Sequence, residues 1–290
     1  FLAVYSPEGS YFVLGGSDET LVVNSAAQAT RPALPNHHSS FLSRCAFSPD
    51  SKLLATVSLD KTVKLWNIER SELMRTLDGH GGYVFGVCFT IDGKQVISSS
   101  NDMTARVYDV TSGVCVRTLP LPGSGFSLAI SACGGLLAVG CNDGAVALFD
   151  ITNEYTPLPT LHAHGGKAWW LHVLFSPVLG QNVLLTNKGN DMEVKVWDLR
   201  NPLQPRKVAV LRGHTAGVND VRFSPGGALI ATGSCDGTIK FWDAVNLREV
   251  HSLQAHDRGR GVTSLAFHPT NPLAFVSCGQ DKKAHLWTSP

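Results

Sequence analysis

Short runs of apolar residues recur along the whole chain, and turn-forming residues separate each run from the next. In one example, the small and mostly apolar stretch 53–58 is followed by Leu59-Asp60-Lys61 and then by 62–66, where apolar and polar residues alternate. A nearly continuous apolar run is typical of a strand covered on both faces, whereas alternation is typical of a strand with one buried face. The pattern therefore predicts pairs of short antiparallel strands joined by tight turns, and no stretch sustains a helical period.

The strand pattern repeats at a nearly constant interval, and an aspartate marks each predicted turn. Successive turn aspartates are 42, 42, 41, 48, 45 and 45 residues apart, and six residues after each comes a strand residue that is usually aromatic. The aspartates are Asp18, Asp60, Asp102, Asp143, Asp191, Asp236 and Asp281. The repeats end near Asn24, Trp66, Tyr108, Phe149, Trp197, Trp242 and Trp287. Units of this size cannot bury both faces of their strands alone, so we expect neighbouring units to stack.

Two dipeptides within the repeat carry a family resemblance. They are the Gly-His pairs Gly79-His80 and Gly213-His214 and the Trp-Asp pairs Trp197-Asp198 and Trp242-Asp243. With this period they make the chain similar to the WD-repeat family. The resemblance implies an all-β, seven-bladed β-propeller that occupies residues 1–290 as a single domain. Each blade would take three strands from one repeat and an outer strand from the next.

That register leaves the ring one outer strand short. The first repeat begins at its innermost strand, and the last one stops just after Trp287. We therefore treat the chain as a fragment and expect residues before Phe1 to supply the strand that closes the last blade. An unpaired edge would otherwise invite aggregation.

Composition and charge narrow the functional classes. Hydrophobic residues make up 43% of the 290 residues and charged residues 16%, with a formal net charge of +1. These values are typical of a folded globule and exclude a strongly electrostatic polymer binder. The 7 cysteines include no Cys-x-x-Cys pair, and no apolar run approaches the ~20 residues that span a bilayer. We expect a soluble protein with reduced thiols, in the cytoplasm or the nucleus.

Histidines pair with the turn aspartates in five repeats, and each pair alone could be mistaken for a catalytic relay. The pairs are His38 with Asp60, His80 with Asp102, His164 with Asp191, His214 with Asp236 and His256 with Asp281. The family resemblance implies a structural network, in which the aspartate accepts a hydrogen bond from His, and His meets a Ser or Thr hydroxyl and then a Trp indole N–H. Because an active site is a single constellation and not five copies, we predict no enzyme activity, no cofactor and no small-molecule substrate.

The fourth repeat departs from this network, and one histidine cluster suggests a different chemistry. Leu121 and Val139 stand where the others have His and Ser or Thr, so we expect blade four, together with blade one, to be more weakly held. His162, His164 and His172 could together be taken for metal ligands. Since His164 already belongs to the repeat, we predict no metal site.

Loop residues without a structural reason gather just before the predicted inner strands and the turn aspartates. In a propeller both places lie at one end of the ring, which we term the top face. The predicted partner-binding residues are Phe41, Leu59, Tyr83, Phe85, Phe126 and Trp169, with Asn101, Asn142 and Asn190 between them and Arg258 and Arg260 on a basic flank. Aromatic anchors within a polar rim are typical of protein and peptide binding.

We therefore predict a non-catalytic scaffold that presents its top face to a protein or peptide within a multi-subunit complex. Two alternatives remain open. Trp197-Asp198-Leu199-Arg200 resembles the box with which WD-repeat substrate receptors dock on cullin ubiquitin ligases, with Arg200 as the docking residue. An RNA-associated propeller is the other, although the small net charge of +1 argues against direct nucleic-acid binding.

Overall fold

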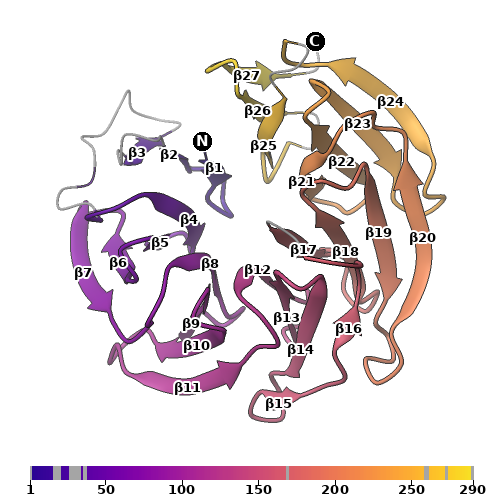
Figure 1. Cartoon of the computed structure of the whole chain (residues 1–290). Coiled ribbons are helices and arrows are strands. Elements are labelled where there is room, and N and C mark those ends of the chain that lie inside the picture. The colour runs from indigo at the N-terminus through magenta and orange to yellow at the C-terminus, as the bar shows by residue number, and fades with distance from the viewer. Residues whose placement is uncertain are drawn as a thin grey trace.

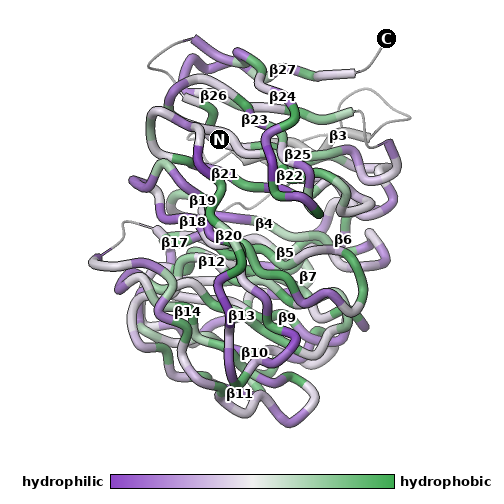
Figure 2. Tube along the Cα trace, turned by 90° about the vertical axis from the view of Figure 1, so that its right-hand side faces the viewer, coloured by the Kyte–Doolittle hydropathy of each residue, from purple (hydrophilic) through white to green (hydrophobic). Residues whose placement is uncertain are grey.

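Consecutive strands pair in antiparallel sheets throughout the computed structural model. The structure describes residues 2–15, 21–25, 34, 38–167, 170–257, 261–271 and 274–288. In Figure 1 the sheets follow one another around a ring, with one strand of each sheet nearest the centre. An all-β propeller is therefore confirmed. Figure 2 shows that hydrophobic segments lie mainly within the strands, while several protruding loops are hydrophilic.

The strands form seven sheets, and their bounds follow the predicted strand pattern. The first two sheets contain β1 (Leu2–Tyr5), β2 (Tyr11–Gly15) and β3 (Leu21–Ser25), then β4 (Leu42–Phe47), β5 (Leu53–Ser58), β6 (Val63–Asn67) and β7 (Glu72–Leu77). The next two contain β8 (Val84–Phe89), β9 (Gln95–Ser100), β10 (Thr104–Asp109) and β11 (Cys115–Pro120), then β12 (Gly125–Ile130), β13 (Leu136–Cys141), β14 (Ala145–Asp150), β15 (Thr156–Pro157) and β16 (Leu161–His162).

The remaining sheets complete the circuit. They contain β17 (Leu171–Phe175), β18 (Val183–Lys188), β19 (Glu193–Asp198) and β20 (Arg206–Arg212), then β21 (Val218–Phe223), β22 (Leu229–Ser234), β23 (Thr238–Asp243) and β24 (Glu249–Gln254), and finally β25 (Val262–Phe267), β26 (Phe275–Gly279) and β27 (Ala284–Trp287). In β7, β11, β20 and β24 the outer strand comes from the sequence of the following repeat, as expected.

The number of blades differs from the expectation. Six sheets, from β4 to β27, carry the repeat between residues 38 and 288, one fewer than the seven blades expected from the sequence. The seventh sheet, β1–β3, has three strands among the described residues. Its repeat is the least regular, because Asn24 replaces the aromatic residue that ends every other repeat, and Asp18 lies outside the described residues.

One outer strand is broken. In the sheet that begins with β12, residues 156–157 and 161–162 pair with β14 as two short pieces, β15 and β16. Pro157 and Pro159 fall in this stretch, and proline has no N–H to donate to a strand ladder. The outer strand therefore cannot pair continuously with β14.

The core lies between neighbouring sheets. One apolar cluster joins Ala55 and Val57 of β5 to Val84, Val87 and Phe89 of β8, and similar clusters fill the other boundaries. Inner strands of adjacent sheets contact each other around the ring, and β1 contacts both β4 and β25. Each inner strand pairs with a neighbour in its own sheet on one side only, and the free edges of these strands surround one central channel.

Candidate functional site

Five copies of a buried hydrogen-bonded chain connect a loop, a turn and two strands. In the sheet β21–β24, His214 Nδ1 lies 2.9 Å from Asp236 Oδ2, and its Nε2 lies 2.7 Å from Thr232 Oγ1. The indole N–H of Trp242 donates to the same Thr232 oxygen at 3.0 Å. The structure brings together all five predicted His–Asp pairs, at distances between 2.8 and 3.0 Å. The corresponding hydroxyls are Thr56, Ser98, Thr186 and Ser277.

The turn aspartate also stabilises a strained backbone position. Lys61 follows Asp60 with a φ of 73°, a left-handed conformation that costs a non-glycine residue free energy. Asp60 Oδ1 accepts the Thr62 backbone N–H at 3.0 Å, and Oδ2 accepts the Ser39 N–H at 3.0 Å. The carboxylate therefore fixes both the turn and the loop from the preceding strand.

Protonation in these chains is set by burial and hydrogen bonding. Burial lowers the pKa of His38, His80, His164 and His214 more than their aspartates raise it. For Asp236, burial raises the pKa, but hydrogen bonds from Thr238, the Thr215 amide and His214 outweigh it and lower the pKa to about 2. In these four repeats the arrangement is a neutral imidazole between a carboxylate and a hydroxyl.

Acid is expected to weaken the fold. A histidine whose folded pKa lies below the unfolded value of 6.5 stabilises the protein above pH 6.5 and loses that stabilisation as the pH falls through the window below it. The lowered aspartate pKa values add a further loss below the unfolded value of 3.8. We expect the urea concentration at the midpoint of unfolding to be lower at pH 5 than at pH 7. An unchanged midpoint over this range would contradict the neutral-imidazole arrangement.

The fourth repeat replaces the polar chain with apolar packing. Leu121 and Val139 are buried together with Phe149, which stands at the position of the tryptophan. Asp143 still accepts the Ala145 backbone N–H at 3.0 Å. The turn is therefore built in the same way, while side-chain packing takes the place of the hydrogen-bonded chain.

A second repeated feature defines the top face. The residue that directly follows the second strand of a sheet donates its backbone N–H to the carbonyl of the residue before the inner strand, as in Asn101 to Tyr83 at 3.0 Å. The same bond joins Leu59 to Phe41 and Gly189 to Trp170. Phe41, Tyr83 and Trp170 are 49%, 46% and 41% exposed, so three aromatic side chains reach solvent at equivalent places.

The predicted aromatic of the fifth unit is displaced by one residue. Trp169 lies outside the described residues, and the structure places Trp170 at the position equivalent to Phe41 and Tyr83. In β4, β8, β12, β21 and β25 the pairing skips one residue near the start of the strand, which is a β-bulge. Strand β17 pairs without a skip from Leu171 onward. Counting six residues back from the Phe175 corner therefore overshoots by one.

The bulged residues of two neighbouring strands form an aromatic pair. Phe85 and Phe126 occupy the skipped positions of β8 and β12, and their ring centroids lie 4.8 Å apart. Tyr83 contacts Phe85 edge to face at 6.4 Å. Both phenylalanines are half-buried. They extend the exposed aromatic residues of the top face toward the channel.

A hollow of about 430 Å³ opens where these side chains meet. Four of the predicted residues, Phe41, Leu59, Phe85 and Phe126, line it together with Trp170. Tyr83 stands beside Phe85. The volume is in the range of small-ligand pockets, which are mostly apolar with a few polar groups. The hollow can therefore accept one or two apolar side chains.

The other predicted contact residues lie in different settings. Asn101 and Asn190 are exposed, whereas Asn142 is half-buried and its Oδ1 accepts the Ser124 backbone N–H at 3.0 Å. Arg258 and Arg260 lie outside the described residues. Arg200 is exposed and makes a bidentate pair with Asp198, through Nε at 3.0 Å and Nη2 at 2.7 Å. Two of its donor groups are thus already engaged within the chain.

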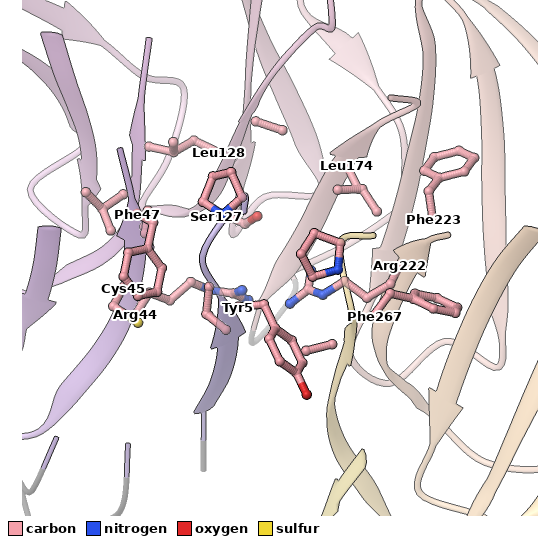
Figure 3. A pocket seen from close by; sticks show the side chains of 18 of the residues that line it. Tyr5, Arg44, Cys45, Phe47, Ser127, Leu128, Leu174, Arg222, Phe223 and Phe267 are labelled. Atoms are coloured by element: carbon pink, nitrogen blue, oxygen red, sulfur yellow. The ribbon is translucent and has the colours of Figure 1, made fainter. Parts of the chain in front are cut away.

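The channel contains charged groups that were not predicted from the sequence. Arg44, His172 and Arg222 line a hollow of about 600 Å³ that also contains Tyr5 and Phe47. Figure 3 shows the Arg44 and Arg222 side chains reaching into this space from opposite walls. Asp220, 4% exposed, pairs with Arg222 at 3.2 Å. Strand alternation could have indicated Asp220 and Arg222 on one face, but not which groups they meet.

The histidines considered as metal ligands are separated by role. His164 belongs to a buried chain, His172 lines the channel, and His162 is exposed on β16. A different cluster brings ligand atoms of His256, Asp281 and His285 within 4.8 Å. Both ring nitrogens of His256 are already hydrogen-bonded, to Asp281 and Ser277. The repeated network therefore accounts for the placement of His256 and Asp281.

Family comparison agrees with this geometry. The profile described as "WD domain, G-beta repeat" matches residues 30–67, 71–109, 205–243 and 247–288, together more than half of the chain. The chain belongs to the WD-repeat family. The matched segments contain four of the five buried His–Asp chains, and the fifth, with the apolar fourth repeat, falls between them.

Curated WD-repeat relatives cover the chain to different extents. Nuclear distribution protein PAC1-2 of Uncinocarpus reesii is 31% identical over 90% of this chain and 61% of its own length. Protein tipD of Dictyostelium discoideum is 29% identical over 99% of the chain and 46% of its own length. Small ribosomal subunit protein RACK1 of Neurospora crassa is 37% identical over 38% of the chain and 33% of its own length. The chain thus spans less than two thirds of each relative.

Within the described part of the chain, no helix is long and apolar enough to cross a membrane.

Proposed function

We propose that this WD-repeat propeller is a non-catalytic scaffold that binds a peptide segment of a protein partner across its top face. The observation that carries the proposal is the apolar hollow lined by Phe41, Leu59, Phe85, Phe126 and Trp170. Exposed aromatic residues around a pocket are the composition of binding hot spots, which favour Trp and Tyr. One relative carries the name of a small ribosomal subunit protein, that is, of a component of a larger assembly.

The proposal includes the organisation of the ring. We propose that residues 1–290 form one domain, because β1 of the irregular first sheet contacts the inner strands β4 and β25 on its two sides. The repeated His–Asp chains serve as structural links between turns and loops in this ring. The partner complex is intracellular, in the cytoplasm or the nucleus, in keeping with 7 cysteines that form no Cys-x-x-Cys pair.

Removing two of the exposed aromatic residues of the top face tests the proposed function. A Tyr83→Ala/Trp170→Ala variant is expected to bind the partner more than about 100-fold more weakly, since a hot-spot aromatic contributes about 2 kcal/mol or more. Its free energy of unfolding should fall by no more than about 1 kcal/mol, because both side chains are partly exposed. The measurement compares proteins captured from the source cell with wild type and with the variant.

A matched control uses exposed apolar residues elsewhere. Val208 on β20 and Val250 on β24 are 48% and 56% exposed on outer strands. A Val208→Ala/Val250→Ala variant should retain every partner that the wild type captures. Equal capture by wild type and the Tyr83/Trp170 variant would overturn the top-face proposal.

A further inference from the structure

The channel beneath the apolar hollow holds one carboxylate and two guanidinium groups. Asp220 Oδ2 accepts the Leu265 backbone N–H at 2.8 Å and lies 3.2 Å from Arg222 Nη2. Its Oδ1 accepts the Val221 N–H at 3.0 Å. Arg222 also donates through Nε to the Leu265 carbonyl at 3.0 Å. Asp220 and Arg222 thus neutralise and fix each other.

Arg44 has no such partner. Among the residues that the structure describes, no hydrogen bond or ion pair involves its guanidinium, although it reaches into the channel opposite Arg222 (Figure 3). Burial and the nearby charge of Arg222 lower the pKa of Arg44. Asp220 opposes this shift, but it is one carboxylate for two guanidinium groups, so the partly buried channel keeps one positive charge in excess.

His172 adds an unused donor. Its Nε2 lies 3.4 Å from Arg222 Nη1, which can only donate, and 4.0 Å from Asp220 Oδ1; a neutral ring that accepts from Arg222 carries its proton on Nδ1. His172 is 4% exposed, and its buried Nδ1 has no hydrogen-bond partner. Burial and the charges of Arg44 and Arg222 hold the pKa of His172 well below 6.5, which keeps the ring neutral. The channel thus combines an unpaired cation with an unpaired N–H donor.

These groups stand where the two hollows meet. Both the apolar hollow and the channel below it are lined by Arg44, Ser127 and His172. A side chain that enters between Phe41, Leu59, Phe85 and Phe126 therefore reaches Arg44 directly. The apolar walls exclude water and strengthen a charge-assisted hydrogen bond at their base.

We propose that Arg44 binds the side-chain carboxylate of an Asp or Glu in a peptide that lies across the top face, with a neighbouring apolar side chain of that peptide in the aromatic hollow. This inference rests on the proposed function and specifies its ligand. One uncompensated positive charge matches one carboxylate. A phosphate group would bring a charge of about −1.5 to −2 and require further donors.

Selection of displayed peptides tests the preference. Random peptides of twelve residues, displayed without a free carboxyl end, are panned against wild type, Arg44→Met and the control Arg212→Met. Arg212, on the exposed outer strand β20, pairs with Glu193 of β19, so its replacement removes the same charge away from the channel. Wild type and Arg212→Met should enrich peptides with an acidic residue beside an apolar one. Arg44→Met should enrich the apolar residue alone.

Affinity measurements on one selected peptide then isolate the contact. Changing its acidic residue to the amide should weaken binding to wild type about 10-fold to 100-fold, the size expected for a hydrogen bond to a charged group. On Arg44→Met the same change should weaken binding less than about 3-fold, because contacting groups are not additive. Arg44→Met should melt at or above the wild-type temperature, since it removes a partly buried charge that has no ion pair.

The outcomes separate this inference from the proposed function. Enriched peptides that lack acidic residues, or equal losses on wild type and Arg44→Met, would each overturn the carboxylate site. Selected peptides that bind the Tyr83→Ala/Trp170→Ala variant as well as wild type would overturn the top-face proposal itself.

Discussion

Replacing Asp220 with Ala is expected to lower the free energy of unfolding by about 3 to 5 kcal/mol, the cost of removing one partner from a buried ion pair. Asp220 is 4% exposed, and its oxygens accept the Leu265 and Val221 amides besides pairing with Arg222. Its removal leaves Arg222 and Arg44 as two unpaired cations in one channel. Chemical unfolding of both proteins at pH 7 measures the difference.

Two further variants show whether the loss comes from the unpaired charge. Asp220→Ala/Arg222→Met removes both members and should recover part of the lost stability, because no orphan charge remains from the pair. Glu154→Ala breaks an exposed ion pair, in which the side chain of Arg117 is 48% exposed and that of Glu154 is 83% exposed. This change should cost less than about 1 kcal/mol. A loss below about 1 kcal/mol for Asp220→Ala would mean that water solvates the channel cations.

Replacing Thr232 with Val is expected to cost about 2 to 4 kcal/mol, although the two side chains have nearly the same shape. Thr232 Oγ1 lies between His214 Nε2 and the Trp242 indole N–H, at 2.7 and 3.0 Å. Valine leaves both groups buried without a partner, and each unsatisfied group costs about 1 to 3 kcal/mol. Urea unfolding of the purified variant measures this loss.

The fourth repeat supplies the control for this substitution. Leu121, Val139 and Phe149 occupy the positions of His214, Thr232 and Trp242 in an apolar form that the same ring already contains. The triple variant His214→Leu/Thr232→Val/Trp242→Phe should be more stable than Thr232→Val alone. It should also lose less stability than wild type on acidification, because one buried imidazole is gone. If the triple variant is the less stable of the two, the polar chain is worth more than its unsatisfied groups imply.

The buried chains could be anticipated from the sequence because repetition identifies equivalent positions. His80 and His214 precede their turn aspartates by the same 22 residues. Once the turn is known, a loop histidine at a constant offset must meet it. The apolar character of the fourth repeat was visible for the same reason, since Leu121 and Val139 break a pattern that its neighbours follow.

The sequence spacing indicates the equivalent places of Phe41 and Tyr83, whereas Trp169, the third predicted aromatic residue, lies outside the described residues. Spacing alone predicted Trp169, whereas Trp170 takes the equivalent position because β17 lacks the extra residue of a bulge. A bulge changes the count of residues without changing their types. Sequence spacing therefore cannot reveal it when only one strand of several differs.

The channel charges could not be anticipated from local patterns. Arg44 and Arg222 lie on β4 and β21, far apart in the chain, and each alone is one polar position in an alternating strand. They meet only because ring closure turns every inner strand toward the same axis. The blade count was also overestimated as seven equal units, because the first repeat shares the spacing of the others but not their aromatic residue.

The bulges give this ring a property that a regular ladder lacks. At the skipped position the strand carries a residue with no Cα partner on its neighbour, as Ser43, Phe85 and Phe126 do in β4, β8 and β12. Those same residues line the apolar hollow of the top face. Mutations there can exchange a hydroxyl for a phenyl ring without breaking a ladder hydrogen bond. Evolution can thus change what the propeller recognises, one residue at a time, while the scaffold continues to fold.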